Sequence, residues 1–187
     1  MNISIVIVSY NSSKSIGECL NTVQKYATEA EIIVVDNNSQ DDTVKKINGV
    51  KLLKLAKNMG FAFACNVGAK EATRDNLLFL NPDCNLTHKA LERMLELLES
   101  SVNIGAVGPL SNFAAGWQNL GYYQCPLVEH GNDPTYSQKI ADDLPQNSEK
   151  KNVKLLIGFC LLISKDLYYD IGGMDVNLPL GMDDLDL

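Results

Sequence analysis

Acidic side chains at two places in this sequence could do chemistry, and the first place follows a short apolar run. Residues 77–80 are too few for a helix, and the Asn-Pro pair after them ends the run, so a buried strand is predicted. Asp83 would lie just beyond the carboxyl end of that strand, where open α/β sheets bind ligands. A carboxylate there could hold a divalent cation against a diphosphate. Asp83 and Asn85 would also suit a turn and a cap before a helix over 88–99, and both interpretations are open.

The second place is a cluster near the end of the sequence. Asp183, Asp184 and Asp186 put three carboxylates within four residues. Like charges this close raise one another's pKa, which favours a metal site, a donor-binding group or a general base. The alternative is the solvated start of a helix, where acidic residues suit the helix dipole. Taken alone, the cluster fits the helix start better.

Length and composition indicate one acidic globular domain. The chain has 187 residues, of which 45% are apolar and 21% are charged, enough for a sizeable core. The net charge of −7 argues against non-specific binding to nucleic acid or to acidic membrane surfaces. The same charge opposes an anionic ligand, and a bound metal ion could offset it locally.

Cysteine usage and hydropathy indicate a cytoplasmic protein. The five cysteines are scattered, odd in number and without a C-x-x-C pair, which predicts reduced thiols rather than a disulfide frame or a zinc site. No apolar run approaches the length of a membrane span, and no basic region precedes the first apolar run. Neither a membrane span nor a signal peptide is therefore expected.

The order of apolar runs predicts an α/β fold. Strand-like runs alternate with amphipathic helical patterns, which is typical of a mostly parallel sheet with helices on both faces. A capping box, Ser15 with Glu18, would begin the first helix. A second, Ser39 with Asp42, would begin the next, and Ser164 would cap the last one. The strands are expected over residues 3–8, 31–35, 50–55, 77–80, 104–107 and 154–164.

One of the expected helices carries mainly small residues on a single face. These residues are Phe61, Cys65, Gly68, Ala69 and Ala72. Small side chains let a helix backbone approach a sheet closely, so this helix is expected to pack tightly on the core.

The regular pattern stops between residues 111 and 152. This segment is rich in Gly, Pro, Asn, Gln and Asp, yet it contains the aromatic residues Trp117, Tyr122 and Tyr123. An irregular segment this long inside a compact domain is usually functional or disordered. The aromatic residues favour a structured lid or an acceptor-facing loop, and a disordered insertion is nearly as well supported.

Five motifs occur in order along the chain. They are Ser9-Tyr10-Asn11, the end of the second strand at 34–39, an Asn/Gly segment at 58–68, Asn81-Pro82-Asp83, and Gly172-Gly173-Met174-Asp175 followed by residues 183–187. Together they resemble the motifs of inverting family-2 glycosyltransferases with the Rossmann-like GT-A fold, especially the rhamnosyltransferase-like branch. The resemblance covers the chain except 112–152. It implies one domain over 1–187, with a nucleotide-binding half (1–110), an irregular segment (111–152) and an acceptor side (153–187).

The resemblance implies a nucleotide-sugar donor and assigns residues to it. Ser9, Tyr10 and Asn11 would line the base and the ribose. Asp36 would accept a hydrogen bond from the base. The other residues of the donor pocket would be Asn58, Gly60, Asn66 and Asn81.

The resemblance also implies the chemistry, which is inverting sugar transfer in the synthesis of a cell-surface polysaccharide or glycan. Asp83 would hold Mg²⁺ or Mn²⁺ against the diphosphate, because such ions take few protein carboxylates and let phosphate oxygens complete their shell. Asp184 would be the general base that takes a proton from the acceptor hydroxyl. Asp183 and Trp117 would contact the sugar or the acceptor, which would be a carbohydrate or a lipid-linked molecule. Nucleic acid is not an expected partner.

This chain departs from the family pattern in two ways. Asn81 stands where the family's Asp-x-Asp site has its first acid, so a metal would rest on fewer carboxylates. The sequence ends at Leu187, where members of the family continue into further helices, so a C-terminally truncated form is expected. Such a form would bind nucleotide but transfer sugar poorly, and its uncovered apolar surface would favour a homo-oligomer.

Two other functions were weighed against the glycosyltransferase. A Rossmann-type oxidoreductase would place a ribose-binding acid where Asp36 stands, but it needs a glycine fingerprint after the first strand, and residues 9–13 contain no glycine. A non-catalytic nucleotide-sugar-binding domain remains open. The presence of both Asp83 and Asp184 counts against it.

Overall fold

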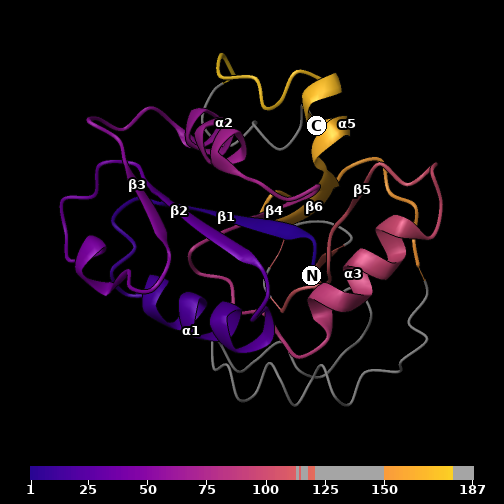
Figure 1. Ribbon diagram of the computed structural model, residues 1–187, viewed down its shortest axis with the longest axis horizontal. Coiled ribbons are helices and arrows are strands. Elements are labelled where there is room, and N and C mark those ends of the chain that lie inside the picture. The colour runs from indigo at the N-terminus through magenta and orange to yellow at the C-terminus, as the bar shows by residue number, and fades with distance from the viewer. Residues whose placement is uncertain (113, 115–117, 121–149, 179–187) are drawn as a thin grey trace.

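A single six-stranded sheet organises the protein. The computed structural model describes residues 1–112, 114, 118–120 and 150–178 (Figure 1). The strands lie side by side in the order β3-β2-β1-β4-β6-β5. Their bounds are β1 Ile3–Ser9, β2 Glu31–Asp36, β3 Lys51–Lys54, β4 Asn76–Leu80, β5 Ala106–Val107 and β6 Cys160–Ser164.

The sheet is mostly parallel, which confirms the α/β expectation. β1 is buried along its whole length and pairs in parallel with β2 on one side and β4 on the other. β3 extends the parallel part beyond β2. β6 runs antiparallel to both β4 and β5. Because the chain passes first to one side of β1 and later to the other, the direction of winding reverses there, and ligands of open α/β sheets bind at such a reversal.

Helices cover both faces of the sheet, as the strand–helix alternation predicts. α1 (Ile16–Tyr26) and α3 (Ala90–Glu99) lie on one face, and α2 (Phe61–Glu71) and α5 (Lys165–Asp170) lie on the other (Figure 1). Each face has its own hydrophobic cluster, because alternate residues of a strand point to opposite sides. Among the described residues, no helix is long and apolar enough to cross a bilayer.

The small residues of α2 let that helix lie very close to the sheet. A Cβ atom added at Gly68 would lie 2.3 Å from Cγ1 of Val6 and 3.2 Å from Cγ2 of Val35, so only glycine fits between helix and strands. The expectation of close packing is confirmed. Since α2 follows β3, its first residue lies at the carboxyl end of the parallel strands, preceded by Gly60 with a φ of 87°.

The last strand is shorter than the apolar run that predicted it. A strand was expected over 154–164, but β6 begins at Cys160. The reason lies in its neighbour, because Leu80 at the end of β4 pairs with Cys160. The next residue, Asn81, donates its backbone N–H to Phe159 O at 2.8 Å, and the proline after it has no N–H to continue the ladder.

The three predicted helix starts differ in outcome. Ser164 caps α5 as expected, because its hydroxyl accepts the backbone N–H of Leu167. Ser15 stands at the N-cap of α1, but its side chain accepts no capping hydrogen bond. The box of Ser39 with Asp42 is wrong. Only a short 3₁₀ turn, η1 (Val44–Lys46), forms in that region, and the Ser39 hydroxyl is used elsewhere.

Candidate functional site

The carboxyl ends of the parallel strands bring together most of the predicted donor residues that the structure describes. Ser9 at the end of β1 is in register with Asp36 at the end of β2. On the other side of β1, Ile7 pairs with Leu80 of β4, so residues 81–83 emerge at the same end of the sheet. Motifs that are far apart in the sequence therefore meet around the end of β1.

Asp36 is a buried carboxylate that is held by neutral donors. Its side chain is 2% exposed, and its two oxygens accept hydrogen bonds from Ser9 Oγ at 3.2 Å and from Ser39 N at 3.0 Å. In the described part of the chain it forms no ion pair. Each oxygen has more than one lone pair, so Asp36 can still accept a hydrogen bond from a ligand N–H or O–H.

The loop after β1 is tied to the loop after β2 through Asn11. Asn11 has a φ of 49°, and its backbone N–H donates to Ser39 Oγ at 2.9 Å. Its side-chain oxygen accepts the backbone N–H of Gln40 at 2.8 Å. Next to it, Tyr10 is 47% exposed. The result is a fixed rim, and it carries an exposed aromatic residue next in sequence to Ser9, the partner of Asp36.

Asp41 strengthens this rim, although the sequence reasoning did not single it out. Its carboxylate accepts the backbone N–H groups of Ser13 at 3.2 Å and Thr43 at 3.0 Å, and also the Thr43 hydroxyl. These hydrogen bonds, led by the one from Thr43, hold the pKa of Asp41 well below its usual range. The spacing of Asp41 and Thr43 is the local signal for an Asx turn, but the partner from the other loop has no local signal.

A second missed residue, Asn37, links β2 to the start of α2. Asn37 is 3% exposed, and its side-chain N–H₂ donates to Asn58 Oδ1 at 2.9 Å and to Gly60 O at 3.1 Å. Its oxygen accepts the backbone N–H of Met59 at 2.8 Å. The buried amide of Asn37, the residue after Asp36, thus fixes the positions of Asn58 and Gly60 through hydrogen bonds.

Asn81 and Asp83 follow β4 in a tight turn. The backbone carbonyl of Asn81 accepts the N–H of Cys84 at 3.1 Å, which leaves Asp83 exposed at the tip. Among the described residues, no group of three or more His, Cys, Asp or Glu side chains could hold a metal ion. A Mg²⁺ or Mn²⁺ ion fits this site only in the way that these ions usually bind, with one carboxylate from the protein and oxygens from a diphosphate and water.

The thiols beside this turn are poor candidates for chemistry. Cys84 lies next to Asp83, and burial together with the charge of Asp83 raises the pKa of its thiol to about 12. Burial also raises the pKa of Cys160 well above its usual value. Since a thiolate is the reactive and metal-binding form, these cysteines stay protonated and inert near neutral pH.

Asn66, which the resemblance assigns to the donor pocket, makes hydrogen bonds within the protein. Its side-chain N–H₂ donates to Met174 O at 2.8 Å, and its oxygen accepts the backbone N–H of Met174 at 3.1 Å. The same oxygen accepts the hydroxyl of Tyr168. Asn66 thus joins α2 to the Gly-Gly-Met turn that follows α5.

Three of the predicted site residues lie outside the described residues. They are Trp117, Asp183 and Asp184, together with most of the segment 111–152. The described site is therefore the donor side and the proposed metal position.

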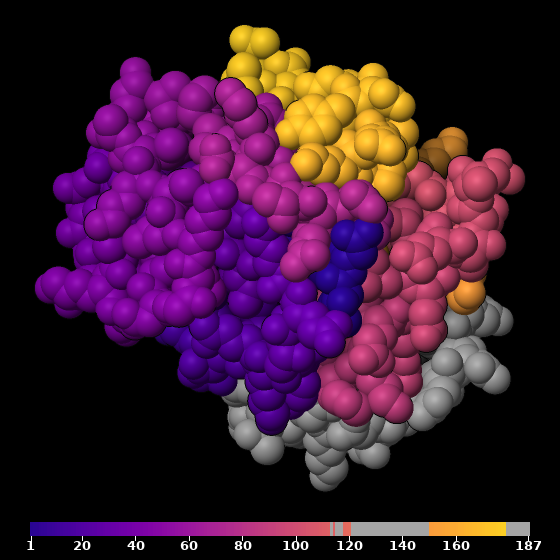
Figure 2. All heavy atoms as spheres, in the orientation of Figure 1, coloured from indigo at the N-terminus to yellow at the C-terminus, as the bar shows by residue number. Residues whose placement is uncertain are grey.

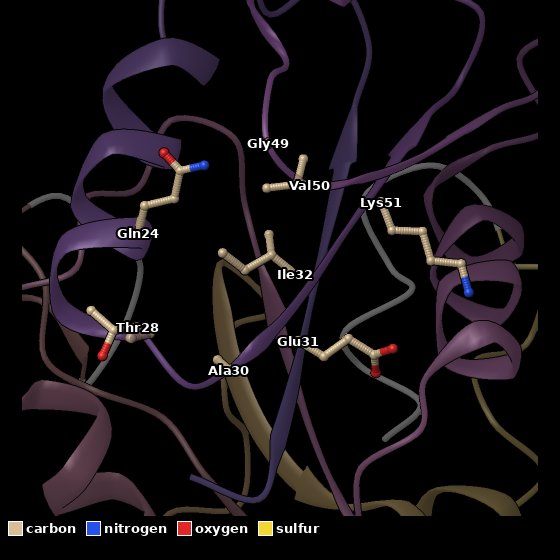
Figure 3. Close-up of a pocket in the computed structure, with 9 residues that line it drawn as sticks. Gln24, Thr28, Ala30, Glu31, Ile32, Gly49, Val50 and Lys51 are labelled. Carbon is tan, nitrogen blue, oxygen red and sulfur yellow. The ribbon is translucent and has the colours of Figure 1, made fainter.

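A separate hollow of about 730 Å³ lies at the opposite end of the sheet, between α1 and the starts of β2 and β3 (Figure 3). Its two charged side chains already have partners. Glu31 accepts the Ser4 hydroxyl and the Thr73 backbone N–H, and Lys51 pairs with Glu71 at 2.8 Å. None of the predicted site residues lines this hollow, so the carboxyl end of the strands is the candidate site.

The chain belongs to glycosyl transferase family 2, because the sequence model of that family matches residues 4–172. Membership of this family rules out the alternative of a Rossmann-type oxidoreductase. It also agrees with the observed fold, in which the sheet order and the helix layers place the motifs at one end of the strands.

Curated relatives carry the same class of name. The chain is 28% identical over 192 residues to glycosyltransferase AglE of Haloferax volcanii, covering 97% of this chain and 58% of the relative. It is 30% identical over 112 residues to the poly-β-1,6-N-acetyl-D-glucosamine synthase of Staphylococcus epidermidis, covering 56% of this chain and 27% of that protein. The chain thus spans little more than half the length of AglE.

A solved structure supports the fold. The mannosyltransferase PcManGT from Pyrobaculum calidifontis, in complex with GDP-Man and Mn²⁺, superposes with a TM-score of 0.72. The match is 18% identical in sequence and covers 98% of this chain and 49% of that chain. At this identity the likeness shows the GT-A-like architecture and leaves substrate unassigned.

Proposed function

We propose that this chain transfers a hexosyl or deoxyhexosyl group from a nucleotide-sugar donor to a hydroxyl of a carbohydrate or lipid-linked acceptor, with inversion at the anomeric carbon. The proposal rests on two carboxylates, one at the end of β2 and one just after β4, the two strands that flank β1. Asp36 is buried with acceptor capacity to spare, and Asp83 is exposed beyond β4 at the same end of the sheet.

The donor base and ribose would bind on the β1–β2 side. Asp36 would accept a hydrogen bond from the base, and Tyr10, which is exposed on the same loop as Asn11, would stack on the base or the ribose. Ser9 and Asn11 hold this surface through their bonds to Asp36 and to residues 39–40. Asn58 and Gly60 would close the other side of the donor pocket, where Asn37 fixes them.

The diphosphate would lie toward the β4 side. Asp83 would hold a divalent cation that offsets the charge on the departing nucleoside diphosphate, and Asn81, two residues before it, would contact the donor. The exposed carboxylate of Asp83 supports Mg²⁺ or Mn²⁺, because oxygen ligands suit hard cations. The complex of PcManGT with GDP-Man and Mn²⁺ supports the use of a divalent cation together with a nucleotide sugar.

The transfer step would be completed by residues that follow in the sequence. Asp184 would take the proton of the acceptor hydroxyl while the oxygen of that hydroxyl bonds to the anomeric carbon. The bond from that carbon to the diphosphate oxygen breaks at the same time, and the electron pair leaves with the diphosphate. Asp183 and Trp117 would contact the sugar or the acceptor. The name of the glucosamine-polymer synthase among the relatives supports polysaccharide or glycan synthesis as the setting.

The proposal is tested with the full-length protein. Calorimetric titration with UDP, GDP and dTDP, each with and without Mn²⁺, identifies the base, and the matching nucleotide sugars are then assayed for transfer. Asp184→Asn should lower kcat by about 10² to 10⁴ and leave the Kd for the nucleoside diphosphate unchanged. Nucleotide binding without any turnover by the unaltered protein would instead identify a non-catalytic nucleotide-sugar-binding domain.

A further inference from the structure

Asn66 lies in the middle of α2 and makes three hydrogen bonds to a segment more than a hundred residues away. Its N–H₂ donates to Met174 O at 2.8 Å, and its oxygen accepts Met174 N at 3.1 Å and the Tyr168 hydroxyl. The sequence separation between Asn66 and Met174 is 108 residues. One amide side chain therefore fixes both backbone groups of a single residue.

The turn that Asn66 holds has little freedom of its own. Gly172 and Gly173 have φ values of 93° and 74°, which residues with side chains rarely adopt. A Cβ atom at Gly173 would lie 2.8 Å from Asn66 Oδ1 and 3.3 Å from the Tyr168 ring. Met174 is 2% exposed, packed in the cluster on the α2 face. The turn is thus held against α2 by the hydrogen bonds of Asn66 and by the packing of Gly173 and Met174.

The contacts of Asn66 with Met174 and Tyr168 are called the clamp below. Tyr168 connects the clamp to β4, the strand that leads to Asp83. Tyr168 is 1% exposed, and the centroid of its ring lies 5.0 Å from the ring centroid of Phe79 in β4. Phe79 is four residues before Asp83 in the sequence. Figure 2 shows the segment after β6 packed directly against α2 on this face of the molecule.

We propose that Asn66 is a positioning residue for sugar transfer, acting by fixing the point from which the chain continues toward Asp183 and Asp184. The inference rests on the proposed function. Asp184 follows Met174 by ten residues, and Gly60 on the donor side precedes Asn66 by six in the same loop-and-helix unit. The clamp therefore ties the donor-binding frame to the start of the segment that carries the proposed base.

The chemistry of the clamp requires an amide. Met174 presents a carbonyl acceptor and an N–H donor, so its partner must donate and accept at the same position. A carboxylate of the same shape could accept from Met174 N but would set an oxygen against Met174 O. Asn66→Asp is thus a nearly isosteric change that removes the donor half. Tyr168→Phe removes another hydrogen bond and keeps the ring on Phe79.

The test measures kcat, the KM for donor and acceptor, the Kd for the nucleoside diphosphate and the melting temperature in the full-length protein. Asn66→Asp should lower kcat by about 10- to 100-fold, as expected for a misplaced reacting group, with the donor Kd within about twofold of the unaltered protein. Tyr168→Phe should show a smaller loss of the same kind. Asn103→Asp, on an exposed loop, is the charge-matched control and should leave kcat unchanged.

Several outcomes would overturn the inference. Loss of donor affinity in proportion to kcat would make Asn66 a donor contact, and a lower melting temperature with unchanged kcat would make it purely structural. If Asn66→Asp does not fold, an unchanged kcat in Tyr168→Phe overturns it. Transfer by the unaltered protein with full transfer by Asn66→Asp rejects this inference alone, whereas no transfer by the unaltered protein rejects the proposed function itself.

Discussion

Ser9 donates its hydroxyl to Asp36 Oδ1 at 3.2 Å, and both side chains are buried where neighbouring parallel strands end. Ser9 is in register with Asp36, so the contact is set by the sheet itself. A carboxylate buried in this way needs donors on both oxygens, and Ser39 N supplies the other. The preorganised acceptor of the proposed base site therefore depends on a hydroxyl from the central strand.

Ser9→Ala should destabilise the fold, because it leaves a buried carboxylate oxygen without its donor. We expect the free energy of unfolding in urea to fall by about 1–3 kcal/mol. Ser15→Ala is the matched control, since the Ser15 side chain makes no capping bond, and it should change stability by less than about 0.5 kcal/mol. Equal effects of the two changes would contradict the role of Ser9.

Asp83→Asn should abolish the dependence of diphosphate binding on a divalent cation. The protein carries a net charge of −7, and the exposed Asp83 is the carboxylate proposed to hold the cation. Titration of the preferred nucleoside diphosphate with Mn²⁺ and with a chelator gives the readout. Glu96→Gln on the exposed side of α3 is the control and should keep the dependence. Equal affinity of the unaltered protein in Mn²⁺ and in chelator would disprove the metal role.

Gly68→Ala should destabilise the protein by about 1–3 kcal/mol, because its methyl group would lie 2.3 Å from Val6 Cγ1. Gly17→Ala in α1 is the control. Nothing lies within 4 Å of a Cβ there, so the change should stabilise the protein by about 0.4–1 kcal/mol. Adding Val6→Ala to Gly68→Ala should cost less than the sum of the two single changes. Additive losses would show that the contact with Val6 is not the cause.

Asp41→Asn should flatten the acid limb of the stability curve. The pKa of Asp41 is lowered in the folded protein by bonds from Thr43 and Ser13. Its contribution is therefore fully present above the ordinary carboxyl pKa and is lost as the pH falls through the lowered value. Melting temperatures between pH 7 and pH 2 would show the difference, with Asp170→Asn on α5 as the control. Parallel curves for Asp41→Asn and the unaltered protein would contradict this assignment.

The fold was predictable from local patterns because each strand and each helix carries its own periodicity. The buried run of β1, the small face of α2 and the Asn-Pro break after β4 all reflect residues close together in sequence. Length was harder to predict. The apolar stretch that predicted β6 starts at residue 154, but Leu80, the last residue of β4, pairs with Cys160. The residues before Cys160 therefore have no partner in β4, and pairing rather than hydropathy sets where β6 begins.

The convergence of the candidate site residues was predictable from the sequence, and their contacts were less so. Motif order placed Ser9, Asp36 and Asp83 at one end of the sheet, because carboxyl ends of parallel strands converge there. Ser39 resembled a helix cap, but its hydroxyl is used by Asn11, 28 residues away. Asn66 was predicted to line the donor pocket, and its side chain also bonds to Met174, 108 residues away. A local motif carries no information about such distant competitors for the same polar group.

The position of β3 at one edge of the sheet bears on how copies of this protein could associate. An exposed edge strand is a template onto which another chain can add, with a risk of runaway aggregation. β3 is four residues long and has an exposed lysine at each end, Lys51 and Lys54. Two copies joined strand to strand in antiparallel fashion would bring Lys54 of each copy toward Lys51 of the other, whose charge is paired with Glu71. The short length of β3 and its lysines therefore disfavour continuation of the sheet across that edge.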